Sequence, residues 1–239
     1  MKASVFTKGA QKLLKLKKCG AVIVAAGSAS RMGGIDKVMA TLRGEPMILR
    51  TVRAFAQSDV IKEIVIVTRQ DLIQPIMELC HDFPKVQAVV AGGSSRQESV
   101  EIGLHTLSKG VKLAAIHDGA RPLISQEVIE HTVRAANTYG AAAPGIPVKD
   151  TIKVTKGGII VATPDRNNLR GIQTPQVFDI DLLKGALQKA RKDKAELTDD
   201  CSAVERLGMS VKVVQGDERN LKVTTPMDLK IAQMLLEEM

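Results

Sequence analysis

Short apolar runs rich in β-branched residues alternate along this chain with longer segments of helical periodicity. The strand-like runs are AVIVAA from Ala21, EIVIVT from Glu63, VQAVVA from Val86, KLAAIH from Lys112 and SVKVVQ from Ser210. Three helix-like segments lie between them and begin at Pro46, Ser95 and Ser125. Such alternation is typical of βαβ units, whose strands form a parallel sheet covered by helices. The pattern therefore predicts an α/β protein with a mostly parallel central sheet and helices on both faces.

One segment departs from this alternation and has the pattern of a β-hairpin. It is DTIKVTKGGIIVATPDR from Asp150, in which two strand-like halves surround Gly157 and Gly158. Paired glycines suit a tight hairpin turn. Three prolines flank the segment, namely Pro144, Pro147 and Pro164, and they indicate that it projects from the sheet. We therefore expect one Rossmann-like domain over residues 19–239 that carries a β-hairpin arm at about 144–166.

The first eighteen residues form a basic extension. Residues 1–18 contain six lysines and no acidic residue, which leaves 28 basic and 26 acidic side chains for the rest of the chain. The net charge of +8 is therefore mostly a property of this extension. With no Trp and one Tyr, the chain also lacks the aromatic side chains on which nucleic-acid bases stack. We therefore expect no nucleic-acid partner, and we interpret the extension as solvated.

The sequence also lacks the features of a membrane or secreted protein. No apolar stretch is long enough to cross a bilayer, and the basic extension has no signal-peptide core. The three cysteines, Cys19, Cys80 and Cys201, are odd in number and widely spaced, unlike a disulfide framework or a zinc cluster. These features predict a cytoplasmic protein without a membrane partner.

A loop of very small residues, AAGSAS, follows the first strand-like run and leads to two cations, Arg31 and Lys37. It fits neither common phosphate-binding motif, because Val38 follows Lys37 where a P-loop needs Ser or Thr, and Ala29 replaces the second glycine of a dinucleotide fingerprint. The physical basis of both motifs still applies, since small residues let backbone N–H groups approach a polyphosphate. The two cations could instead be solvated surface residues.

Ligands of parallel sheets bind beyond the carboxyl ends of the strands. The small-residue loop, the segments AGGSS and HDGARP, and the arm should therefore meet at one mouth. Asp118 directly follows a predicted strand, where its carboxylate could hold Mg²⁺ against phosphate oxygens or serve only as a loop cap. Lys222 is a site candidate that lies just before a predicted helix. Thr225 and Asp228 form the capping pattern at the start of that helix. Thr198 could be no more than a helix N-cap.

Taken in order, seven segments resemble the 2-C-methyl-D-erythritol 4-phosphate cytidylyltransferases, a nucleotidyltransferase family of the non-mevalonate isoprenoid pathway. The segments are AAGSASRMGG with the following DK, AGGSSRQESV, HDGARP, PVKDTIK, DRNNLRGIQTPQVF, LTDDCSAVE and NLKVTTPMDL. The resemblance runs from about Ala21 to the C-terminus, and HDGARP, TPQ and the last segment are its most specific parts. Asp36, Ala29 and Ser94 depart from the family pattern, which usually has Pro at the first position and often has Gly and Asp at the others.

This resemblance implies transfer of CMP from CTP to 2-C-methyl-D-erythritol 4-phosphate, with Mg²⁺ or another divalent cation, in a homodimer formed through the arm. The implied catalytic residues around the α-phosphate are Arg31, Lys37 and Lys222. The implied CTP-binding residues are Ala25, Ala26, Gly27, Gly93, Ser94, Ser99, Asp118 and Gly119, with Asp118 also near the metal. The implied substrate-binding residues are Arg121, Thr151, Arg166 and Thr198. The first three of these would serve the neighbouring subunit's site, because the family's arm crosses a two-fold axis.

Three other functions remain open from the sequence. A ribitol-5-phosphate cytidylyltransferase shares the fold and the first loop. A nucleotide-sugar glycosyltransferase would usually need a D-x-D motif, whereas HDGA offers one aspartate. An inactive nucleotide-binding homologue is the third, and the joint presence of Arg31, Lys37, Asp118 and Lys222 argues against it.

Overall fold

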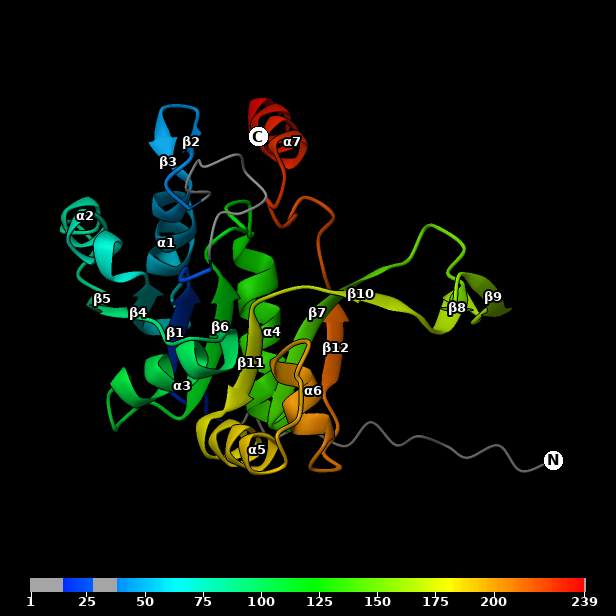
Figure 1. Ribbon diagram of the computed structural model, residues 1–239. Helices are drawn as coiled ribbons and strands as arrows, with labels where there is room; N and C mark the ends of the chain where they lie inside the picture. The colour runs from blue at the N-terminus through cyan, green and yellow to red at the C-terminus, as the bar shows by residue number, and fades with distance from the viewer. Residues whose placement is uncertain (1–14, 28–37, 239) are drawn as a thin grey trace.

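An eight-stranded mixed sheet forms the centre of the protein in a computed structural model that describes residues 15–27 and 38–238 (Figure 1). Its strands are β1 (Cys19–Val24), β4 (Ile61–Thr68), β5 (Val86–Ala91), β6 (Leu113–Asp118), β7 (Ala141–Pro147), β10 (Arg170–Ile172), β11 (Gln176–Asp179) and β12 (Lys212–Gln215). The spatial order is β10-β7-β11-β6-β1-β4-β5, and β12 pairs with β7. The β1, β4, β5 and β6 strands pair in parallel, as do β7 and β12, whereas β10 and β11 run antiparallel to their partners. The predicted, mostly parallel sheet is confirmed.

Helices cover both faces of the sheet, as predicted. One face carries α1 (Met47–Gln57), α2 (Ile73–Leu79) and α4 (Gln126–Tyr139), and the other carries α3 (Arg96–Thr106), α5 (Ile180–Lys192) and α6 (Asp200–Glu205). Successive side chains of a strand point to opposite faces. Accordingly, Ala21 and Ile23 of β1 pack in the cluster that contains α1 and α4, while Val22 packs in the cluster that contains α3 and α5. Across the described residues, we find no helix with the length and apolarity needed to cross a bilayer.

A third, smaller cluster lies beside the carboxyl end of the sheet. It joins α7 (Pro226–Glu237) to the short strand β2 (Thr41–Leu42) through buried side chains, among them Leu42, Val223 and Ala232. The β2 strand pairs with a second short strand, β3 (Glu45–Pro46). The predicted capping pattern of α7 is confirmed, because Thr225 and Asp228 form a reciprocal capping box. Thr198, in contrast, is not an N-cap. Its neighbour Asp199 takes that place, and its carboxylate accepts a hydrogen bond from the Ser202 N–H at 2.9 Å.

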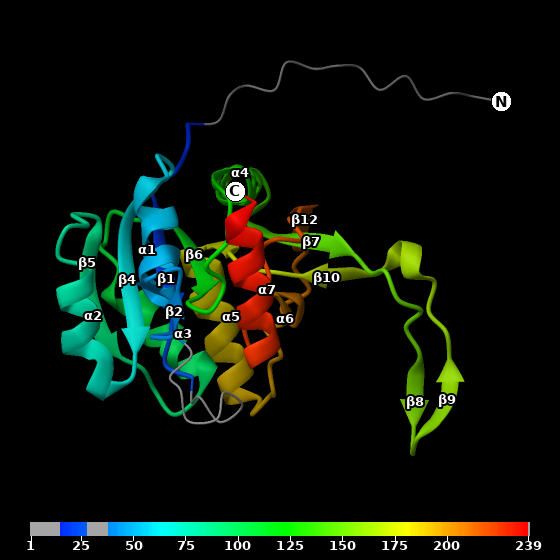
Figure 2. The same ribbon diagram turned by 90° about the horizontal axis from the view of Figure 1, so that it is seen from above.

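The predicted arm projects from the sheet as a separate hairpin of β8 (Val154–Lys156) and β9 (Ile159–Ala162) (Figure 2). A 3-10 turn at Arg166–Asn168 leads back to β10, and a second one precedes α2 at Gln70–Leu72. The flanking prolines, however, do not lie outside the sheet, since Pro144 and Pro147 belong to β7. Pro144 has no N–H group to donate, but its carbonyl accepts a hydrogen bond from the Gln173 N–H at 2.8 Å. The strand tolerates the proline because this residue pairs through its carbonyl.

The basic extension is shorter than the sequence predicted, because residues 16–18 contact the folded unit. Leu16 packs against the core cluster of α1 and α4. The Lys17 ammonium pairs with Asp179 at 3.0 Å, and the Lys18 carbonyl accepts hydrogen bonds from the Lys112 and Leu113 N–H groups at 2.9 and 3.1 Å. Residues 16–18 attach the segment before β1 to the start of β6, and they therefore belong to the fold.

Two truncations test this boundary. Deleting residues 1–14 should leave the free energy of unfolding unchanged. Deleting residues 1–18 should lower it by roughly 1 to 3 kcal/mol, since the longer deletion also removes the Leu16 packing and the hydrogen bonds of Lys18. Urea unfolding followed by circular dichroism measures both values. Equal midpoints for the two truncated proteins would show that residues 15–18 contribute nothing to the fold.

Candidate active site

A cavity of about 420 Å³ opens where β1, β5 and β6 end, the position at which open α/β sheets bind ligands. Its wall is formed by residues 25–27 after β1, residues 93–96 after β5, Asp118 at the end of β6 and Lys222 before α7. The cavity thus gathers four segments that are far apart in the sequence. Eight of the residues predicted for the site line it, namely Ala25, Ala26, Gly27, Gly93, Ser94, Ser99, Asp118 and Lys222.

Small residues are required at this wall because two loops approach each other closely. A Cβ atom on Gly92 would lie 2.5 Å from the Ala26 Cβ and 2.8 Å from the Ser99 Oγ, so any side chain there would force the loops apart. The Gly93 N–H donates a hydrogen bond to Ser99 Oγ at 3.2 Å. The loop after β5 therefore packs closely against the loop after β1 at Gly92 and is tied to α3 at Gly93, and the small residues leave backbone atoms of both loops accessible.

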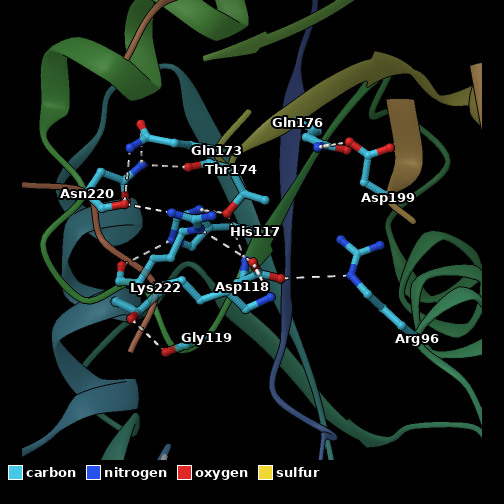
Figure 3. A network of polar contacts seen from close by, with 12 residues as sticks. Arg96, His117, Asp118, Gly119, Gln173, Thr174, Gln176, Asp199, Asn220 and Lys222 are labelled. Carbon is cyan, nitrogen blue, oxygen red and sulfur yellow. Dashed lines mark hydrogen bonds and ion pairs between the residues drawn. The ribbon is translucent and has the colours of Figure 1, made fainter. Parts of the chain in front are cut away.

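Asp118 is a buried carboxylate that three cations surround (Figure 3). Its Oδ2 atom lies 3.0 Å from the Lys222 Nζ and 3.4 Å from the Arg121 Nε, and its Oδ1 atom lies 3.8 Å from the Arg96 Nε. Burial alone would raise the pKa of Asp118, but the charges of Lys222, Arg96 and Arg121 outweigh it and hold the pKa at about 2. Asp118 is therefore an anion at every physiological pH.

Arg96 is a member of the site that the sequence interpretation missed. It begins α3, lines the cavity and pairs with the buried Asp200 carboxylate, with 2.7 Å between Nη2 and Oδ2. Gln176 supports this pair, because its side-chain oxygen accepts hydrogen bonds from the Asp200 and Cys201 N–H groups at 3.0 and 3.1 Å. A cation in the first turn of a helix opposes the helix dipole, and that unfavourable position is the signal that could have marked Arg96.

Two predicted residues lie next to the cavity but not in its wall. Gly119 is buried, its N–H donates to the Val24 carbonyl at 2.9 Å, and an added Cβ would lie 3.1 Å from the Ala25 Cβ. Arg121 donates to the Asn220 carbonyl at 2.7 Å and pairs with Asp118 of its own chain. Neither residue lines the cavity within one chain, and the two partners of the Arg121 guanidinium, Asp118 and Asn220, belong to its own chain.

The remaining predicted residues are not brought to this cavity within one chain. Thr151 and Arg166 are exposed on the two connections of the arm, where the Arg166 Nη1 donates to the Lys149 carbonyl at 3.2 Å. Thr198 is exposed in the loop before α6. Arg31 and Lys37 lie outside the described residues.

His117 lies directly behind Asp118, on the strand side of the cavity (Figure 3). Its ring is fully buried, and burial lowers the pKa of His117 to about 3 although the neighbouring Asp118 charge opposes this shift. The imidazole is therefore neutral at physiological pH. A neutral histidine cannot add a fourth positive charge to the cluster around Asp118.

A divalent cation would find one protein carboxylate here. Asp118 is the single acidic side chain among the described residues that line the cavity, and the described residues contain no cluster of three potential metal ligands. The Asp118 Oδ1 is the freer of the two oxygens, since its nearest cation is Arg96 at 3.8 Å, beyond hydrogen-bond distance. One carboxylate oxygen suits Mg²⁺, which takes its other ligands from nucleotide phosphates and water.

Comparisons with known proteins give the same family over almost the whole chain. The sequence model of the 2-C-methyl-D-erythritol 4-phosphate cytidylyltransferase family matches residues 19–238. A relative with this name from Caldanaerobacter subterraneus is 43% identical, covering 91% of this chain and 98% of the relative. Another from Symbiobacterium thermophilum is 44% identical, with coverage of 91% and 92%.

Solved structures show the same fold. The crystal structure of 4-diphosphocytidyl-2C-methyl-D-erythritol synthase from Anaerococcus prevotii superposes with a TM-score of 0.84 at 31% identity, covering 92% of this chain and 96% of that one. The 2-C-methyl-D-erythritol 4-phosphate cytidylyltransferase from Thermus thermophilus gives a TM-score of 0.76 at 30% identity, with coverage of 90% and 98%. On this combined similarity of sequence and fold, the chain belongs to the 2-C-methyl-D-erythritol 4-phosphate cytidylyltransferase family.

Proposed function

We propose that this protein transfers CMP from CTP to 2-C-methyl-D-erythritol 4-phosphate, which gives 4-diphosphocytidyl-2-C-methyl-D-erythritol and pyrophosphate in the non-mevalonate isoprenoid pathway. The observation that carries this proposal is the Asp118–Lys222 pair in the wall of a cavity built from small residues. The family model and the relatives described above are named for the methylerythritol substrate, which favours it over ribitol 5-phosphate.

The reaction requires alignment and charge stabilisation rather than proton transfer. An oxygen of the methylerythritol phosphate, already anionic at neutral pH, forms a bond to the α-phosphorus of CTP. The bond from that phosphorus to the β-phosphate oxygen breaks, and pyrophosphate leaves with the electron pair. Charge accumulates on the α-phosphoryl oxygens during this exchange, so cations placed around them lower the barrier. We assign this role to Lys222, together with Arg31 and Lys37.

The cytidine would lie between the loops that follow β1 and β5. We assign its contacts to Ala25, Ala26, Gly27, Gly93, Ser94 and Ser99. Support comes from their common position in the cavity wall and from the close approach of Gly92 to Ala26, which leaves backbone atoms accessible. Asp118 would meet the ribose and the metal. Gly119 would act by its lack of a side chain, because it packs under Ala25.

We also propose that the enzyme uses Mg²⁺ or another divalent cation. The Oδ1 atom of Asp118 would hold it beside the triphosphate. When bound, the cation would neutralise part of the triphosphate charge and favour departure of pyrophosphate. Asp118 suits this role because its low pKa keeps it ionised throughout the working range.

The arm is proposed as the dimer contact through which Thr151 and Arg166 reach the neighbouring subunit's substrate. An isolated two-stranded hairpin is marginally stable in water. This one exposes Ile159, Ile160 and Val161, with Ile159 71% exposed, so an apolar partner surface would stabilise it. A two-fold axis supplies such a surface to both copies. Thr198 and Arg121 would complete the substrate site from the subunit that binds CTP.

We place this reaction in the cytoplasm. All three cysteines are buried free thiols, which is the state that a reducing compartment maintains.

Release of pyrophosphate tests the proposed function directly. The full-length protein is supplied with CTP and Mg²⁺ and with each phosphopolyol in turn. We expect rapid release with 2-C-methyl-D-erythritol 4-phosphate and little with ribitol 5-phosphate. Comparable rates with both would assign a broader substrate range, and release with ribitol 5-phosphate alone would overturn the proposal.

Replacing Lys222 tests charge stabilisation at the α-phosphate. Lys222→Ala should lower kcat by roughly 10²-fold, because a positive charge near the transferring group is lost. Lys230→Ala is the matched control, since Lys230 is exposed on α7 and the substitution removes the same charge. Steady-state kinetics with saturating substrates measure both variants, and a kcat within twofold of wild type for Lys222→Ala would remove Lys222 from the reaction.

Replacing Asp118 tests the metal assignment. Asp118→Asn keeps the shape of the side chain and removes its charge, so Mg²⁺ should no longer strengthen CTP binding. Calorimetric titration of CTP with and without Mg²⁺ measures this difference. The control is Asp82→Asn, a charge-matched change at an exposed position. If Mg²⁺ strengthens binding to Asp118→Asn as much as to wild type, Asp118 does not hold the metal.

Mixing two inactive variants tests the shared site. Subunits with Arg166→Ala are combined with subunits with Lys222→Ala under conditions in which exchange is demonstrated. If Arg166 serves the partner's site and Lys222 its own, each mixed dimer contains one intact site, and activity should rise toward about a quarter of wild type at equal mixing. No recovery despite exchange would place both residues in one subunit's site or remove Arg166 from the substrate.

A further inference from the structure

The turn that carries Asp118 and Arg121 is held by hydrogen bonds from four directions. The Asp118 N–H donates to Thr174 Oγ1 at 3.1 Å, and the Gly119 N–H donates to the Val24 carbonyl at 2.9 Å. The Gly119 carbonyl accepts from Thr51 Oγ1 at 3.0 Å, and the Ala120 carbonyl accepts from the Val223 N–H at 2.9 Å. This turn is therefore fixed before any substrate arrives.

His117 links the two ends of this turn (Figure 3). Its Nδ1 atom lies 3.0 Å from Thr174 Oγ1, the oxygen that also accepts from the Asp118 N–H. Its Nε2 atom lies 3.3 Å from the Arg121 carbonyl oxygen. One imidazole thus contacts the residue that anchors Asp118 and, at the same time, the backbone of Arg121.

The polarity of these bonds determines which ring nitrogen carries the proton. The Arg121 carbonyl can only accept, so the His117 Nε2 atom that faces it carries the proton. A neutral imidazole has a single N–H, so Nδ1 is unprotonated and accepts from the Thr174 hydroxyl. The Thr174 Oγ1 atom keeps lone pairs with which it accepts from the Asp118 N–H. Every group in this chain of bonds has the partner it needs.

The surroundings keep the ring in this orientation. His117 is 0% exposed and Thr174 is 4% exposed, so water cannot replace either partner without opening the core. The Phe55 ring packs against the imidazole with 4.7 Å between centroids and an interplanar angle of 52°. A ring flip would bring Nε2–H toward the Asp118 anchor and leave the Arg121 carbonyl without a donor, which is costly in a buried site.

We propose that His117 is a positioning residue, which in its Nε2–H form sets the Asp118 end of the turn through Thr174 and the Arg121 end through the Arg121 carbonyl. This proposal rests on the proposed function, in which the two ends of the turn act on different substrates. The Asp118 end faces CTP and its metal, and the Arg121 end faces the phosphopolyol. His117 itself touches neither substrate.

Two substitutions separate the two ends. His117→Gln places an amide near the position of Nε2 and keeps a donor for the Arg121 carbonyl, but it removes the acceptor for Thr174. His117→Asn places an amide oxygen near the position of Nδ1 and keeps that acceptor, but it removes the donor for Arg121. Thr174→Val, with Thr174→Ser as its conservative control, removes or keeps the hydroxyl without changing the ring. Urea unfolding establishes the folded fraction of each variant.

Steady-state kinetics with each substrate varied in turn give the expected pattern. Roughly tenfold increases are expected in the KM for CTP with His117→Gln and Thr174→Val, and in the KM for the phosphopolyol with His117→Asn. In each case the other KM should change less than about threefold, and Thr174→Ser should resemble wild type. Equal changes in both KM values for all variants, or losses that follow the folded fraction alone, would overturn the proposal and leave His117 a structural core residue.

A measurement without substrate keeps this inference separate from the proposed function. Nitrogen NMR of labelled histidine distinguishes the two neutral tautomers, and His117→Gln assigns the signal. The proposal expects Nε2–H for His117 at neutral pH, and an Nδ1–H tautomer or an imidazolium would overturn it. If the wild type releases no pyrophosphate while the Nε2–H tautomer is observed, the proposed function fails and the His117 bond pattern stands.

Discussion

The site depends on one buried anion, Asp118, which holds three cations from separate parts of the chain. Lys222 comes from the segment before α7, Arg96 from the start of α3 and Arg121 from the turn after β6. Leaving the buried Asp118 carboxylate without these partners would be strongly destabilising. The sheet, the third cluster and α3 therefore meet at Asp118, and each of them supplies a group to the same cavity.

This arrangement explains how a small-residue loop can bind a triphosphate. Backbone N–H groups and helix N-termini attract anions, but they do not select where charge develops during a reaction. In the proposed function Lys222 has this role, since Asp118 holds its ammonium 3.0 Å away while 40% of its side chain remains exposed at the cavity. The ammonium is thus positioned before the nucleotide binds, so little reorganisation is needed when charge accumulates on the α-phosphate.

Much of this could be predicted from sequence because it depends on local patterns. Alternating apolar runs identified β1, β4, β5, β6 and β12, and the small residues around Ala26 and Gly93 identified two walls of the cavity. The strands β7 and β11 were missed, since β7 contains two prolines and β11 is a short antiparallel strand that breaks the βαβ rhythm.

Other features could not be predicted because they depend on long-range contacts. Arg96 joins the site through Asp200, which is 104 positions away, and His117 joins it through Thr174, which is 57 positions away. No spacing rule in the sequence connects such pairs. The pairing of Arg121 with Asp118 of the same chain is likewise visible only in the fold.

The ionisation of Asp118 in the substrate-free protein tests the central claim most directly. Carbon NMR of labelled aspartate, with the signal assigned by its loss in Asp118→Asn, follows the side-chain carboxyl through an acid titration. If three cations converge on this buried group, its pKa is about 2 and the carboxylate is still ionised at about pH 3. A pKa at or above the ordinary aspartate value of about 3.9 would show that the cations are not assembled around Asp118 before substrate binds.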